Sequence, residues 1–495
     1  MVFSSQVFVF YFLPIALAVY FSVSALYPRM RNLSLALLGY VFYGWSNPLF
    51  IVLMFGTTAI DWLASLVVAH DDWRLWARAR PAPALAPGTP RSRLQHGAIV
   101  VSVVSNLLVL GFFKYFNFGI DNYNALVRGL GFEGAAWVGV LHVVLPLGIS
   151  FYTFQSLSYT IDVYRGHARA LDRFVDFSCF VSMFPHLVAG PILQFSFLSG
   201  QLTGRSLTVD KFARGVALFS LGMGKKVLLA NPCGKIADTV FTAPSAHALD
   251  AWYGAVAYAF QIYFDFSGYS DMAIGLGLML GFVFAKNFDS PYRSRSITEF
   301  WRRWHISLST WLRDYLYIPL GGNRRGPVRT YVNLILTMLL GGLWHGASWN
   351  FLVWGGLHGG CLAVERALAG RGALAGRGRR WGAPPIQWMA TFLVVLVGWV
   401  FFRAASLPDA VAYLRTMAGL TTTSEAADLL RGLVYKPYYV GTFVLAAVVV
   451  WSAPQAWDFT RRLTWPRACA SLAVLWLALV VLFTQAYNPF IYFIF

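Results

Sequence analysis

The sequence has few cysteines and lacks the motifs of several enzyme classes. Its four cysteines are widely spaced and form no Cys-x-x-Cys pair, which argues against a disulfide framework and a zinc site. No Gly-x-x-x-x-Gly-Lys-Ser/Thr loop is present to cradle a phosphate, so a nucleotide-driven pump is not indicated. No Gly-x-Ser-x-Gly elbow is present either, so a serine acyl-enzyme is not suggested. We therefore expect neither a metal site nor a bound cofactor.

Charged residues are also scarce. Only 12% of the 495 residues are charged, whereas 58% are apolar or aromatic, and the mean hydropathy is +0.57. Because a spanning helix needs roughly 20 apolar residues, the chain predicts an all-α polytopic membrane protein with about eleven or twelve transmembrane helices. Re-entrant and interfacial helices are expected in addition. We predict a single membrane domain over residues 1–495 without a soluble domain.

The net charge of +18 is concentrated in short loops between apolar runs. This placement follows the positive-inside rule and does not indicate nucleic-acid binding. The rule places the loops 74–93, 165–173, 366–380 and 461–467 in the cytoplasm, and it places the loop between Phe402 and Val440 outside. The N-terminus has no basic region and no cleavage site, so it predicts a retained first span.

Several apolar stretches contain features that are unusual in a simple span. The stretch 174–192 is interrupted by two prolines and His186, which predicts a re-entrant element. The stretch 252–284 is longer than one crossing requires, which predicts that it is tilted, bent or broken, with residues 267–270 as the expected position. Lys225 and Lys226 occur in a mostly apolar span, where we expect them to snorkel to an interface, with contact to an anionic donor as the alternative.

Asp265 and Asp271 lie inside the long apolar stretch 252–284. Carboxylates in a spanning helix are costly, so both should face the interior and be paired. Six residues apart, they are separated by about 120° on an ideal helix, which argues against a general acid/base pair. We favour bracing of the arginines in the segment that follows, and lining of a reaction tunnel is the alternative.

The segment 284–330 carries nine basic side chains against three acidic ones, so it is the most strongly cytoplasmic part of the chain. Ser296 and Glu299 have the spacing of a capping box, which starts a helix. Aromatic and apolar residues then recur at spacings of three and four as far as Tyr315. The pattern predicts one amphipathic helix at a membrane interface, with its arginines toward lipid or solvent.

His345 lies in a glycine-rich apolar run that begins near Arg329. A rise of about 1.5 Å per residue places it roughly 24 Å along this run, deep in the membrane or toward its outer side. It is either a buried structural histidine or a proton acceptor that activates a hydroxyl. The residues alone leave both roles open.

Four motifs resemble the membrane-bound O-acyltransferase family: FPHLVAGPI at 184–192, YFDFSGYSDMAIG at 263–275, the block 287–326, and GGLWHGASWNFLVWGGLHG at 341–359. They are most similar to the bacterial branch that contains alginate O-acetyltransferase and related exopolysaccharide and cell-wall acetylation proteins. The resemblance implies that His345 is catalytic and that His305 occupies the upstream polar catalytic position. It also implies a catalytic core at about 174–366.

Other residues in these motifs are candidates for the same site. The candidates for binding the donor or lining the tunnel are Asp265, Asp271, Arg302, Arg303, Trp304, Asp314, Trp344 and Ser348. His186 and His358 are candidates for supporting the catalytic histidines, although a structural role is favoured for both.

The resemblance implies transfer of an acetyl group from a cytoplasmic thioester, acetyl-CoA or an acyl carrier protein, across the bacterial inner membrane. The acceptor would be an alginate-like exopolysaccharide or a cell-wall glycan, reached directly or through a periplasmic acetyltransferase partner. We expect His305 near the inner face and His345 toward the outer one, joined by a tunnel. The alternatives are a transporter or flippase for a polysaccharide export system and a structural subunit. Membrane lipid is an expected partner and nucleic acid is not.

Overall fold

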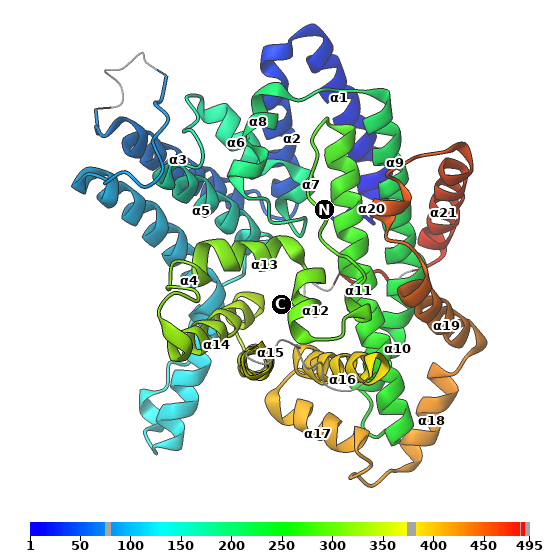
Figure 1. The fold of residues 1–495 in the computed structure, drawn as a ribbon. Coiled ribbons are helices and arrows are strands. Elements are labelled where there is room, and N and C mark those ends of the chain that lie inside the picture. Colours follow the sequence, from blue (N-terminus) through cyan, green and yellow to red (C-terminus); the bar gives the residue numbers. More distant parts are fainter. Residues whose placement is uncertain (75–80, 374–382, 486, 491–495) are drawn as a thin grey trace. The chain divides into compact units, whose positions relative to one another are not determined.

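The computed structural model describes residues 1–74, 81–373, 383–485 and 487–490 (Figure 1). Every regular element in these residues is a helix and no strand occurs there, which confirms the all-α fold. The parts of the predicted cytoplasmic loops that fall at 75–80 and 374–380 lie outside the described residues.

The chain forms two compact units. The first unit comprises residues 1–212 and 277–284, and the second comprises 213–276 and 285–495. The α-helices of the first unit are α1 (Leu13–Leu26), α2 (Arg31–Gly44), α3 (Leu49–His70), α4 (Arg93–Gly129), α5 (Ile149–Arg165), α6 (Phe174–Ser182), α7 (Phe184–Leu187) and α8 (Phe195–Gly204). A π-helical turn, η1 (Phe8–Phe12), precedes α1.

The second unit contains the remaining helices. In chain order they are α9 (Val209–Gly224), the π-helix η5 (Lys225–Ala230), α10 (Asn231–Phe241), α11 (Ala248–Met279), α12 (Ile297–Arg303), α13 (Ile306–Leu312), the π-helix η7 (Arg313–Tyr317), α14 (Gly326–His345), α15 (Trp349–Ala373), α16 (Pro384–Arg403), α17 (Leu407–Met417), α18 (Glu425–Val434), α19 (Pro437–Ser452), α20 (Ala456–Phe459) and α21 (Trp465–Thr484). Helices α9 and α11 each begin in one unit and end in the other.

In the first unit, α3, α4 and α5 pack on one another. Asp61 of α3 is fully buried and accepts hydrogen bonds from Ser102 Oγ at 2.6 Å and Asn106 Nδ2 at 2.8 Å, both on α4. Because a buried carboxylate must be hydrogen-bonded, these bonds fix α3 against α4.

In the second unit, α14 and α15 form a closely packed pair, seen side by side in Figure 1. A Cβ atom on Gly342 would lie 2.2 Å from the carbonyl oxygen of Phe351. Only glycine permits so close an approach of two helix backbones. The short connection between the helices therefore holds His345, the last residue of α14, beside the first turns of α15.

Five helical segments within the described residues are long and apolar enough to cross a membrane, or six if one bent pair counts as a span. They are Phe8–Leu26, Leu49–His70, Arg93–Gly129, Pro384–Arg403, Trp465–Thr484 and the pair Glu425–Val434 with Pro437–Ser452. The predicted first span is among them. The expected eleven or twelve is larger because several helices are short, such as α2 with 14 residues, and others, such as α14, contain polar site residues.

Residues 267–270 contain no break, because α11 is one continuous helix of 32 residues, whereas the alternatives of a tilt or a bend stay predictions. Gly268 serves a different purpose. A Cβ atom there would lie 2.7 Å from the carbonyl oxygen of Gly222 on α9, so the glycine allows two helices to touch.

The stretch 174–192 is interrupted as predicted, since α6 ends at Ser182 and the four-residue α7 follows. Its re-entrance into a membrane stays a prediction.

Candidate active site

The segment around His305 is a tight turn and not part of one continuous helix. Helix α12 ends at Arg303, α13 begins at Ile306, and His305 between them has a φ of 43°. The predicted single helix through this region is therefore wrong. Left-handed backbone costs a non-glycine residue roughly 1–3 kcal/mol and is often found at functional sites. Here the turn is held by a hydrogen bond of 2.9 Å from the Ile306 amide to the Asn287 carbonyl.

The start of α12 is fixed by two side chains. Ser296 Oγ accepts a hydrogen bond of 3.0 Å from the Glu299 amide, which confirms the predicted helix start. The carboxylate of Glu365, on α15, accepts bonds from the amides of Ile297 and Thr298 at 2.5 and 2.9 Å. A negative charge at a helix N-terminus is favourable, so Glu365 anchors α12 to α15.

Asn287 determines how the imidazole of His305 is oriented. Its Oδ1 lies 3.2 Å from Nδ1 of His305, and the amide oxygen can only accept, so Nδ1 carries the proton. Oγ of Ser307 donates to the same oxygen at 2.9 Å. The Asn287 amide nitrogen in turn donates to Ser270 Oγ on α11 at 2.8 Å. The proton on Nδ1 leaves the lone pair on Nε2, as proton transfer to the ring requires.

His305 is fully buried, and its Nε2 atom has no hydrogen-bond partner within the described part of the chain. Burial lowers the pKa of His305 from 6.5 to about 3, because the charged ring would be poorly solvated. The imidazole is therefore neutral at physiological pH, and its Nε2 lone pair can accept a hydrogen bond from a substrate.

His345 is enclosed by aromatic rings at the end of α14. Its ring centroid lies 4.9 Å from that of Trp344, 5.2 Å from that of Trp354 and 5.2 Å from that of Phe402. The side chain is 7% exposed. Edge-to-face contacts with three rings fix the plane of the imidazole and keep bulk water away from it.

The indole of Trp344 joins the two histidines. Its centroid lies 6.3 Å from that of His305 as well as 4.9 Å from that of His345. Both imidazoles therefore lie next to the same indole ring. The distance between their ring centroids is at most the sum of these two centroid distances. The two histidines are therefore close together, and their placement relative to the two membrane faces stays a prediction.

His358 and Trp304 form the next layer. His358 is fully buried, and its ring centroid lies 5.0 Å from that of Trp354, which itself contacts His345. Trp304 is buried, and its ring lies 4.9 Å from that of Trp399, which in turn lies 5.4 Å from that of Phe402. Both residues therefore belong to the layer of rings that packs around the aromatic enclosure of His345.

The predicted partners of the two carboxylates on α11 are wrong. Asp265 pairs with Lys226 at 2.7 Å and Asp271 pairs with Lys225 at 2.6 Å, so lysines of η5 take the place of the expected arginines. The side chains of Lys226 and Asp265 are only 3% and 2% exposed, so the predicted snorkelling of Lys226 is also wrong. Buried charges persist when they are paired, and these pairs join η5 to α11.

The remaining candidates make local contacts or are exposed. Arg303 bonds to Glu299 at 3.0 Å and Asp314 to Arg313 at 2.7 Å, whereas Arg302 is exposed. Ser348 Oγ accepts a bond of 3.2 Å from the Asn350 amide where α15 begins. Roles for these residues in the reaction stay predictions.

His186 belongs to the first unit. It is fully buried there, and its Nε2 lies 2.8 Å from the carbonyl oxygen of Phe180. This contact supports the structural role that was favoured for it.

The sequence analysis did not identify Asn287, Ser307 or Glu365 as site residues. Asn287 opens the motif block 287–326 and precedes His305 by 18 residues, a separation that no helical or strand spacing predicts. Glu365 is the one acidic residue at the end of α15, and its isolation among basic residues was a usable signal.

Comparison with known proteins defines the class to which this site belongs. Residues 167–406 match the model of the membrane-bound O-acyltransferase family. The chain is 47% identical to a probable alginate O-acetylase of Pseudomonas aeruginosa over 91% of this chain and 81% of that protein. It is 44% identical to a probable alginate O-acetylase of Azotobacter vinelandii over the full length of both. It is also 36% identical to a peptidoglycan O-acetyltransferase of Helicobacter pylori, over 87% of this chain and 83% of that protein.

The chain therefore belongs to the membrane-bound O-acyltransferase family. It is a multi-pass membrane protein and an acyltransferase, which favours the catalytic reading of the site over the transporter and structural alternatives.

Proposed function

We propose that this protein is an O-acetyltransferase that moves an acetyl group from a cytoplasmic thioester to a hydroxyl on the outer side of the bacterial inner membrane. The observation that carries the proposal is the pair of buried histidines, His305 and His345, on the same indole ring. The alginate O-acetylases among its relatives favour an alginate-like exopolysaccharide as the final acceptor, and the peptidoglycan O-acetyltransferase makes a cell-wall glycan the second candidate.

In this reaction His345 acts as the general base. As the acceptor oxygen bonds to the acetyl carbon, its proton passes to His345, the carbon–sulfur bond breaks, and the proton then passes to the leaving thiolate. A positioned base typically contributes about 10² to 10⁴ in rate. His305 positions or polarises the thioester carbonyl or relays the proton at Nε2, because Asn287 holds the proton of its neutral ring on Nδ1.

The exposed arginines of the segment 284–330 favour a donor that carries negative charge. Arg295, Arg302, Arg324, Arg325 and Arg329 are exposed, and none forms an ion pair within the described residues. By contrast, Lys286 and Arg303 are neutralised by acidic neighbours. The unneutralised arginines would attract the phosphates of coenzyme A or the phosphopantetheine arm of an acidic carrier protein. Either donor would deliver its acetyl thioester from the cytoplasm.

The acetyl group can reach the glycan by two routes. The glycan itself reaches the site, or a periplasmic acetyltransferase partner receives the acetyl group first and passes it on. The first route requires a glycan-binding site on this chain, and the second requires a protein-binding one.

The test compares the acetyl ester content of the surface polysaccharide in cells that carry wild-type protein, His345→Ala or His142→Ala. His142 is an exposed histidine of the first unit and serves as the matched control. At equal membrane abundance, we expect His345→Ala to lose acetyl ester while the polymer is still exported, and His142→Ala to match wild type. Normal acetylation by His345→Ala would refute the mechanism, and loss of the polymer itself would favour a role in export.

A further inference from the structure

Helix α11 supplies two residues to the surroundings of His305. Phe266 and Ser270 are four residues apart on this helix, so they lie on the same face of it. The ring centroid of Phe266 lies 4.5 Å from that of His305, with the two ring planes at 87°. Ser270 reaches the histidine through Asn287, whose amide nitrogen donates to the Ser270 hydroxyl oxygen at 2.8 Å. The helix therefore contacts the imidazole directly at one residue and indirectly at the other.

The orientation of the Asn287 amide is decided by its neighbours. The backbone amide of Ser307 can only donate, and it lies 3.1 Å from Oδ1 of Asn287. The oxygen of the side chain therefore faces the His305 turn, and the nitrogen faces Ser270. An amide nitrogen can only donate, so it needs an acceptor on that side, and the Ser270 hydroxyl oxygen is one.

The hydrogen bond to Ser270 is made in the interior of the protein. Asn287 and Ser270 are each 1% exposed, so bulk water does not replace a lost partner there. A buried N–H group without a partner is unfavourable. If the Ser270 oxygen were removed, the amide would gain by turning its nitrogen toward another acceptor. Such a turn would weaken the contact of 3.2 Å between Oδ1 of Asn287 and Nδ1 of His305.

Helix α11 gives Ser270 a fixed position. Its two buried carboxylates, which flank Ser270 in the sequence, form ion pairs of 2.6 and 2.7 Å with the lysines of η5. Gly268, two residues before Ser270, lets the same helix approach the backbone of α9 closely. A hydroxyl on a helix held in this way can keep the Asn287 amide in one place.

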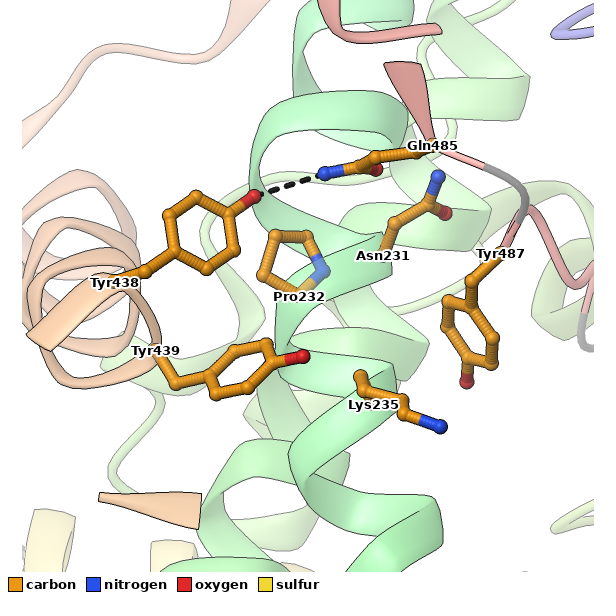
Figure 2. Close-up of a pocket in the computed structure, with 7 residues that line it drawn as sticks. All are labelled: Asn231, Pro232, Lys235, Tyr438, Tyr439, Gln485 and Tyr487. Carbon is orange, nitrogen blue, oxygen red and sulfur yellow. Dashed lines mark hydrogen bonds between the residues drawn. The ribbon is translucent and has the colours of Figure 1, made fainter. Parts of the chain in front are cut away.

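Ser270 is placed to act through other residues and not on a substrate. An open pocket of this unit is lined by residues of α10, α19 and the segment that follows α21, such as Asn231, Tyr438 and Tyr487, and none of its lining residues comes from α11 (Figure 2). Ser270 is buried against Asn287 instead. Its effect on the reaction therefore passes through the Asn287 amide.

We propose that Ser270 is a positioning residue for acyl transfer, which holds the amide of Asn287 so that Asn287 keeps the proton of the neutral His305 ring on Nδ1. The inference rests on the proposed function, because it requires that His305 takes part in the reaction. Phe266 packs against the same imidazole, but a phenyl ring has no polar atom that could select which ring nitrogen carries the proton.

The test is a double-mutant cycle on the rate at which complemented cells add acetyl ester to their surface polysaccharide, per molecule of folded protein in the membrane. We compare wild type with Ser270→Ala, Asn287→Leu and the variant that carries both changes. Ser267→Ala is the matched control. Ser267 is also 1% exposed on α11, and its hydroxyl has no hydrogen-bond partner among the described residues.

We expect Ser270→Ala to be about twofold to fivefold slower than wild type, because the loss of one hydrogen bond changes a tautomer preference by up to about fivefold. Ser267→Ala should match wild type. The double variant should be no slower than Asn287→Leu, because the effects of residues that act through one another do not add. A wild-type rate in Ser270→Ala, or multiplication of the two effects in the double variant, would overturn the inference.

A second measurement is independent of activity. The nitrogen NMR spectrum of the purified protein, labelled at histidine, distinguishes a protonated ring nitrogen from a bare one, and the signals that disappear in His305→Ala belong to His305. We expect the Nδ1–H form in wild type and in Ser267→Ala, and a mixture of the two tautomers in Ser270→Ala. Unchanged signals in Ser270→Ala would overturn the inference. Normal acetylation by His305→Ala would refute the proposed role of His305 and leave the NMR result standing.

Discussion

Asn287 should be needed for full activity, although it makes no contact with substrate in the proposed mechanism. Its side-chain oxygen receives hydrogen bonds from His305 Nδ1 and from both the amide and the hydroxyl of Ser307. Asn287→Leu removes this shared acceptor with little change in volume. Asn287→Asp keeps the acceptor and adds a charge that favours imidazolium.

The expected size of the effect follows from these bonds. One hydrogen bond is worth about 1 kcal/mol net, so its loss alone changes the preference for the Nδ1–H tautomer about fivefold. The upper limit is the full contribution of a positioned base, about 10² to 10⁴ in rate. We therefore expect Asn287→Leu to retain at most about a fifth of wild-type activity. The activity of Asn287→Asp should lie between those of wild type and Asn287→Leu.

The assay is transfer from labelled acetyl-CoA by the purified protein, together with surface acetyl ester in complemented cells. Asn333→Leu is the matched control, because Asn333 is equally buried but donates to backbone carbonyls at Leu320 and Gly322. It should lose thermal stability and keep its activity per folded molecule. If Asn287→Leu retains wild-type turnover at matched folding, the orientation of His305 does not matter and the reasoning fails.

Two further variants test the packing around the site. Gly342→Ala should destabilise the protein by about 1–3 kcal/mol through overpacking against Phe351. Gly360→Ala should not, because open space surrounds the position of its Cβ. Thermal unfolding midpoints compare the two variants, and equal midpoints would refute the overpacking. Lys226→Met should cost about 3–5 kcal/mol because it leaves Asp265 buried without its cation, and adding Asp265→Leu should restore most of that stability. Failure of the double variant to recover would mean that the pair has a role beyond stability.

The sequence predicted the structural features that depend on residues close together in the chain. Apolar length predicted the first span at Phe8–Leu26, and the Ser296 to Glu299 spacing predicted the start of α12. The LWHG motif ends α14 at His345, where glycines let α15 approach. Each of these features depends on residues close together in the chain.

The features that sequence reasoning missed depend on distant partners. The aromatic spacing continues smoothly through His305, so nothing local indicates that the backbone turns left-handed there. The turn exists because Asn287 bonds to it from 18 residues upstream. Likewise, Lys226 and Asp265 are 39 residues apart, and only the crossing of η5 with α11 brings them together.

The choice of an amide at position 287 agrees with what the chemistry requires of His305. A carboxylate there would hold the ring as imidazolium, with no lone pair to accept a proton. An amide oxygen orients the ring while leaving it neutral, and full burial reinforces that state. The rings of Trp344, Trp354 and Phe402 also keep bulk water from His345, and in the proposed mechanism such water would hydrolyse the thioester in place of transfer. A neutral, oriented base in a dry enclosure is what acyl transfer to a hydroxyl needs when water is the competing acceptor.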